Sequence, residues 1–170
     1  MTATPFPSEV IEFDVDDPRT VGTSRHEMES GTPSVIDLNA ELAKLAMFRR
    51  TPQSTAEDRK GSGARLASYR DGALFAIKFS GKDHWESHLT GDELVHLLDG
   101  TATLEIAGED GLQSFALRAG MIAVIPQGAW HRLHSSEGAT QMTATPFPGE
   151  HIGLDVDDPR VVESQVVRTP

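Results

Sequence analysis

The segment GKDHWESHLTGDELVHLLDG, Gly81 to Gly100, concentrates side chains that can bind a metal ion. It contains His84, Glu86, His88 and Glu93 within a short run. Imidazole nitrogens and carboxylate oxygens are common protein ligands of divalent transition metals. Which of them can share one ion depends on secondary structure. A helix would pair His84 with His88, whereas a strand would pair Glu86 with His88.

This segment is predicted to be a strand. Gly81 and Gly91 enclose too few residues for a stable helix, and the flanking sequence is typical of strands. Side chains on a strand alternate between faces, and neighbours on one face lie roughly 6.6 Å apart. Glu86 and His88 can therefore hold one ion. His84 is too far from His88 for that, and we expect it at the mouth of a pocket.

Two further candidates begin strands that follow turns. A turn at residues 90–92 precedes Glu93, which can fold back opposite the first pair. A second turn at residues 126–128 precedes His131, which can meet the other three side chains inside a barrel. Alternation places His134 on the opposite face of that strand, so we expect it on the outside.

The elements around these residues are predicted to be short strands. Between about residues 64 and 148, the apolar runs that suggest strands are ALFAIKFS, ELVHLLD, TATLEIA, QSFALRA, MIAVIP, AWHRLHS and ATQMTAT. Asp-Gly pairs at 71–72, 99–100 and 110–111 are each typical of a hairpin turn. Strands at this spacing without intervening helices indicate an all-β antiparallel sandwich or barrel.

The two metal-binding stretches resemble the two motifs of the cupin superfamily. The first motif has His-x-His, a Glu after three or four residues, and a Gly after six more. The second has a Gly, five residues, Pro-x-Gly, two residues, a His, three residues and an Asn. The matching residues here are His88, Glu93 and Gly100 for the first motif, and Gly120, Pro126, Gly128 and His131 for the second.

The resemblance covers about Gly81 to Ser135. It implies a double-stranded β-helix (jelly-roll) barrel with His88, Glu93 and His131 as ligands of a divalent metal. The sequence departs from the family pattern at two positions. Glu86 replaces the first histidine of His-x-His, and Ser135 replaces the asparagine that ends the second motif.

Glu86 changes the expected chemistry of the site. As a fourth ligand it would give two imidazoles and two carboxylates, whose charge offsets that of a divalent cation. The ion would then be a weaker Lewis acid, and Fe or Mn would be favoured, with Zn or Ni possible. Alternatively, Glu86 stays unbound and acts as a general base. Without metal, Glu86 and Glu93 would repel, and one of them would have a raised pKa.

The remainder of the chain is divided by its composition. We expect an extended arm over 1–33, a short strand, helix and linker over 34–63, the barrel over 64–148 and a tail over 149–170. Asn39 is a candidate cap for the helix. MTATPFPSEVIEFDVDDPR at 1–19 recurs as MTATPFPGEHIGLDVDDPR at 142–160, and only four of the nineteen positions differ. This repeat suggests either a duplicated arm or two copies in related edge positions, one of them on a neighbouring subunit.

The composition of the chain limits which partners and which cellular location we expect. The net charge of −11 argues against nucleic acid or an anionic membrane surface as the main partner. There are no cysteines, which excludes disulfides and thiolate chemistry. The sequence shows neither a signal-peptide pattern nor an apolar stretch of the roughly 20 residues that span a membrane. We therefore expect a cytoplasmic protein.

Together these features predict a metal-dependent cupin enzyme acting on a small organic substrate inside the barrel. The reaction would be oxygenation or metal-assisted proton transfer, of isomerase, lyase or cyclase type. The alternative is a binding or sensor module without turnover. Exposed sheet edges and an apolar outer face predict a homodimer. The other histidines are expected outside the site: His96 and His134 on the outer face, and His26 and His151 solvated in the tails. Trp85 and Trp130 are expected to serve packing.

Overall fold

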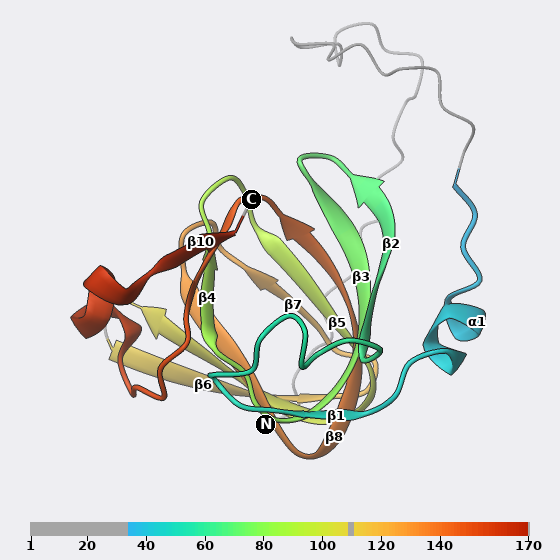
Figure 1. Cartoon of the computed structure of the whole chain (residues 1–170), viewed down its shortest axis with the longest axis horizontal. Coiled ribbons are helices and arrows are strands. Elements are labelled where there is room, and N and C mark those ends of the chain that lie inside the picture. Colours follow the sequence, from blue (N-terminus) through green and yellow to red (C-terminus); the bar gives the residue numbers. More distant parts are fainter. Residues whose placement is uncertain (1–33, 109–110, 170) are drawn as a thin grey trace, which may run out of the picture. The chain divides into compact units, whose positions relative to one another are not determined.

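The computed structural model describes residues 34–108 and 111–169 (Figure 1). The expected arm at 1–33 lies outside the described residues, as does the first copy of the repeat. The elements are α1 (Leu38–Ala43), β1 (Phe48–Arg50), β2 (Gly63–Tyr69), β3 (Gly72–Lys82), β4 (Trp85–His88), β5 (Glu93–Gly108), β6 (Gly111–Arg118), β7 (Ile122–Ile125), β8 (Trp130–Pro146), β9 (Gly149–Ile152), the 3-10 helix η2 (Pro159–Gln165) and β10 (Val167–Thr169). Strands therefore make up most of the described part of the chain, and helices very little of it.

The long strand β8 organises the barrel. Its second half lies between β3 and β5, and its first half pairs with β4 and with the later part of β5. β6 and β7 pair with β5, while β2 and the parallel strand β1 pair with β3. In Figure 1 these strands curl around a common interior. This is the all-β jelly-roll barrel that the sequence predicts.

Alternation along the strands separates an inner from an outer face. On β3, Phe75, Ile77 and Phe79 face inward, and Phe79 is only 1% exposed. Cross-strand neighbours extend the inner face into rows, with Ile77 opposite Gln141 and Gln141 opposite Leu97. One end of the interior is a closed apolar core made of Phe79, Val95, Leu97, Ala102, Leu104, Leu117, Ile125, Leu133 and Ala139.

Two of the three predicted hairpins form, and the third is a bulge. Tyr69 pairs with Gly72 across a two-residue turn, and Gly108 pairs with Gly111. Asp99 and Gly100, by contrast, lie inside β5, where its register with β8 shifts. Gly100 has a φ of +77°, and a Cβ there would overlap the carbonyl oxygen of Gly138. This Asp-Gly pair therefore bends one long strand, because close approach to β8 requires a glycine.

The segments flanking the barrel differ from expectation in detail. Asp37 caps α1 by accepting a hydrogen bond from the Ala40 backbone N–H, so the cap is not Asn39. Residues 149–170, expected as a tail, include β9, which pairs with β4, and β10, which pairs with β9. The sheet thus continues beyond residue 148. The second copy of the repeat, 142–160, contains the end of β8 and all of β9. None of the described helices is long and apolar enough to cross a membrane.

Candidate metal centre

Four side chains converge at one place in the barrel interior. They are Glu86 and His88 on β4, Glu93 at the first position of β5, and His131 near the start of β8. One ligand atom from each lies within 4.8 Å of the others. The expected pairing of Glu86 with His88 on one strand face is confirmed. That all four bind a metal remains a prediction.

Backbone pairing holds these side chains together. Glu86 lies directly opposite His131 in the register of β4 and β8. The backbone N–H of Gly128 donates to the His88 carbonyl at 2.8 Å, which links the turn before β8 to β4. The two sequence motifs are therefore joined by main-chain hydrogen bonds as well as by their side chains.

Hydrogen bonds orient His131 and Glu93. The Nδ1 of His131 donates to the carbonyl of Ala129 at 3.0 Å, and its Nε2 lies 2.8 Å from Oε2 of Glu93. Thr145 Oγ1 donates to the other oxygen of Glu93 at 2.5 Å. His131 is 1% exposed and Glu93 is 4% exposed, so both are shielded from water. The backbone contact at Nδ1 leaves Nε2 of His131 as the atom that faces the cluster.

Both carboxylates are ionised in the metal-free chain. Burial alone would raise the pKa of Glu86, but the His84 ring and the nearby His131 lower it to about 2. Burial would likewise raise the pKa of Glu93, but its hydrogen bond from His131 and the nearby His88 ring lower it to about 2. The expected raised pKa of one carboxyl is therefore wrong, because neighbouring histidines outweigh the repulsion between the two acids.

His131 carries the compensating proton. Burial would lower its pKa, but the hydrogen bond and the negative charge of Glu93, together with the charge of Glu86, raise it to about 9. At neutral pH the metal-free site therefore holds two carboxylates and a protonated His131. A divalent cation would replace the proton as the balancing charge.

His88 has no comparable partner. It is 5% exposed, and neither of its ring nitrogens has a hydrogen-bond partner within the described structure. Its Nε2 lies 3.5 Å from Oε2 of Glu93. A buried imidazole without partners is costly in free energy, and a metal ion bound at Nε2 would remove much of that cost. The donors present therefore fit a divalent ion held by two imidazoles and two carboxylates.

The cluster opens into a cavity of about 570 Å³. Its apolar wall includes Phe75, Ile77, Val95 and Leu133, and its polar wall includes Gln141, Thr143 and Thr145. His151 also lines it, from a position opposite Glu86 in the pairing of β9 with β4. The expectation of a solvated His151 in a tail is therefore wrong, because β9 carries it into the pocket wall. A cavity of this volume can enclose a small organic molecule.

Comparison with known proteins agrees with this geometry. The family model described as a cupin domain matches residues 73–145. A cupin-2 domain protein from Shewanella frigidimarina is 26% identical, with a TM-score of 0.50, over 66% of this chain and 95% of that one. Residues 73–145 form a cupin domain. The family match therefore spans both motifs and the four clustered side chains.

Two other solved structures show how far the likeness extends. A Neisseria meningitidis protein is 20% identical, with a TM-score of 0.50, over 65% of this chain and 96% of that chain, so it shows the fold alone. A hydroquinone 1,2-dioxygenase from Sphingomonas is 17% identical, with a TM-score of 0.43, over 49% of this chain and 64% of that one. That likeness is too slight to carry an argument about reaction. No curated protein matches the sequence.

Behind Glu86, this cupin has a supporting group that the sequence did not suggest. Arg59, in the segment expected to be a linker, donates to Nδ1 of His84 and to the Ser54 carbonyl. With Nδ1 acting as acceptor, Nε2 of His84 carries the hydrogen, and it lies 3.5 Å from Oε2 of Glu86. His84 is thus placed to orient Glu86 rather than to bind the same ion as His88. The sequence offers no reason to expect this role for Arg59, because Arg59 and His84 are 25 residues apart in the chain.

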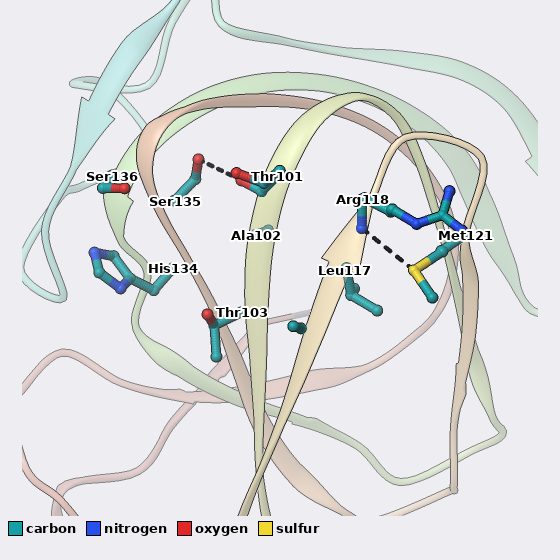
Figure 2. Close-up of a pocket in the computed structure, with 10 residues that line it drawn as sticks. Thr101, Ala102, Thr103, Leu117, Arg118, Met121, His134, Ser135 and Ser136 are labelled. Atoms are coloured by element: carbon teal, nitrogen blue, oxygen red, sulfur yellow. Dashed lines mark hydrogen bonds between the residues drawn. The ribbon is translucent and has the colours of Figure 1, made fainter.

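The remaining aromatic and histidine residues lie apart from the cluster. Trp85 is fully buried, and its indole N–H donates to the Val156 carbonyl at 2.9 Å, so it serves packing as expected. Trp130 packs against the same small apolar cluster. His134 lines a separate hollow of about 530 Å³, bordered by β5, β6 and β8. Figure 2 shows the residues around it. None of the four clustered residues lines that hollow, which agrees with an outer position for His134.

Proposed function

We propose that this cupin is a metal-dependent enzyme that acts on a small organic molecule in the barrel cavity. The observation that carries the proposal is the buried His88 ring, which has no hydrogen bond within the described structure and lies beside three other ligand-type side chains at the cavity wall. Fe(II) or Mn(II) is favoured by a set of two imidazoles and two carboxylates, and Zn or Ni would also accept these ligands.

A bound divalent ion would supply an open coordination position and Lewis-acid or redox chemistry beside the substrate. Oxygenation and metal-assisted proton transfer are the reaction types that this chemistry supports. The chain's own contribution is the cavity, which holds the substrate beside the cluster, and Glu86, which is either a ligand or a base. A carboxylate with a pKa of about 2 accepts protons poorly at neutral pH, which favours the ligand role for Glu86.

The test is the metal content of the protein purified without an immobilised-nickel column, measured by mass spectrometry. Near-stoichiometric iron or manganese in the wild type is expected, with a large loss in Glu86→Ala. His134→Ala, which changes a histidine outside the cluster, is the matched control and should retain the metal. Metal retained in Glu86→Ala would show that Glu86 is not a ligand and leave it as a base or a bystander. No metal in any of the three proteins would contradict the metalloenzyme proposal.

The second candidate function is a binding or sensor module without turnover. The observation that favours it is that Glu86 is the one base candidate within the described metal cluster. Product analysis of the metal-loaded protein after incubation with a binding compound separates the two functions. Unchanged compound at full metal occupancy would favour the binding module.

A further inference from the structure

Gln141 is a buried polar side chain with an unused hydrogen-bonding atom. It lies on β8, is 4% exposed and lines the cavity beside the metal cluster. Its Oε1 has no hydrogen-bond partner within the described part of the chain. An unpaired buried carbonyl oxygen is unfavourable in free energy and is rare in folded proteins. Such an atom in a cavity wall points to a group that the cavity receives.

The neighbours of Gln141 are apolar. Ile77 on β3 and Leu97 on β5 lie directly opposite it on either side, so both side chains share its face of the sheet. The next inward-facing positions along β8 and β3 are Ala139 and Phe79, which belong to the closed core. Gln141 therefore lies at the inner end of the cavity. Its polar side chain separates the apolar core from the space in which a ligand would bind.

The path from the metal cluster to Gln141 follows one face of β8. Thr145 donates to Glu93, and its hydroxyl is 2.7 Å from that of Thr143, the next residue on the same face. Gln141 follows Thr143 on that face, about 13 Å along the strand from Thr145. The cross-strand neighbours of Thr143 on this face are apolar: Phe75 on β3 and Val95 on β5. The space suits one ring or a short chain.

We propose that Gln141 accepts a hydrogen bond from a hydroxyl group of the substrate, on an otherwise apolar, ring-sized molecule. This proposal rests on the proposed function, because it assumes that the cavity is the substrate site. A hydroxyl donates one hydrogen, which Oε1 of Gln141 can accept, and its oxygen can also accept from the amide N–H groups of the same side chain. An ammonium group would bring three donors into an apolar row and leave two of them unsatisfied. A purely apolar ligand would leave Oε1 buried and unpaired.

The test uses phenol and its methyl ether, anisole, which differ in the donor hydrogen and one methyl group. Binding to the metal-free full-length chain is followed by ¹H–¹⁵N NMR at the side-chain amide of Gln141. Phenol should bind about fivefold more tightly than anisole, the factor that corresponds to one net hydrogen bond. In Gln141→Leu the two affinities should become equal. Gln113→Leu, an exposed glutamine on β6, should keep the preference.

Equal affinities in the wild type would overturn the proposal, and so would a phenol preference that survives in Gln141→Leu. Thermal unfolding supplies an independent check on the ligand-free proteins. Gln141→Leu should unfold at the same temperature or higher, because it removes an unpaired buried polar group. A fall of several degrees would show that Gln141 serves the fold instead. These measurements need neither metal nor turnover, so failure of the enzyme proposal would leave their outcome readable.

Discussion

At the scale of single residues, His131 in the metal-free site carries a proton that a bound metal must displace. His131 has a pKa of about 9, whereas Glu86 and Glu93 are already ionised at neutral pH. Metal bound through Nε2 of His131 should therefore release about one proton per ion at pH 7. Affinity should rise about tenfold per pH unit from pH 7 to about 9 and then level off. Calorimetry in buffers of different ionisation enthalpy measures the proton count.

The same shift predicts how the metal-free protein responds to pH. A pKa raised from 6.5 to about 9 means that protonated His131 stabilises the fold fully below pH 6.5. That stabilisation is lost as pH rises from 6.5 to about 9. The melting temperature of the metal-free chain should fall across this window, and bound metal should reduce the fall. For the calorimetric experiment, release of zero or two protons per metal ion would contradict the assignment of the proton to His131.

A third prediction concerns His84, which we expect to position Glu86. His84→Phe keeps a ring of similar size but removes both nitrogens, so Glu86 loses the contact with Nε2. Removing such a supporting group typically weakens metal binding by about 10-fold or more. Isothermal titration of the metal into the variant measures this. Lys60→Gln, at an exposed residue on the cavity rim that pairs with Glu57, is the control. An unchanged dissociation constant in His84→Phe would show that His84 only lines the cavity.

Sequence spacing located the four clustered residues but not those around them. Glu86, His88, Glu93 and His131 were found because strand alternation and two turns dictate where they point. Arg59 was not, since nothing local connects it to His84. Gln141 carried a readable signal: Gln141, Thr143 and Thr145 alternate in ATQMTAT, which puts three polar side chains on one strand face. On β8 that is the face that looks into the barrel.

At the scale of elements, the bulge in β5 offers a test of how the barrel bends. Gly100→Ala should destabilise the protein by more than about 3 kcal/mol, because it combines a positive φ with overlap against Gly138. Gly120→Ala is the matched control, since Gly120 has a φ of +87° but no heavy atom within 4 Å of the added Cβ. It should cost about 1–2 kcal/mol. Urea unfolding measures both, and equal losses would contradict a role for the close approach.

The outcomes for Asp-Gly pairs and for the C-terminal segment have a common physical reason. An Asp-Gly pair permits a hairpin, but whether the chain turns or only bends depends on the strand beside it. At 71–72 the neighbour is β2, the strand just before, whereas at 99–100 it is the distant β8. The secondary structure of residues 149–152 is similarly ambiguous when their sequence is considered alone. They become a strand through pairing with β4, a contact that no local pattern encodes.

At the scale of the whole molecule, the outer face of the barrel carries an apolar row that crosses four strands. Val124 on β7 lies opposite Leu94, which lies opposite Ala144, which lies opposite Leu74. These residues border a hollow of about 560 Å³. Val124 is 61% exposed and its neighbour Ile122 is 58% exposed. Among the described residues, β7 pairs only with β5, so it is a sheet edge. Such a face on a soluble monomer favours association.

We propose that a second copy of the chain covers this face, because a two-fold axis near β7 would bring the two edge strands and their valines together. The wild type should elute with twice the chain mass in size-exclusion chromatography with light scattering. Val124→Asp should elute as a monomer, since it places two carboxylates in a desolvated interface. Val161→Asp, at a valine that is 75% exposed in η2, should remain dimeric. A monomeric wild type at working concentration would rule the dimer out. A dimeric Val124→Asp would place the interface on another face of the barrel.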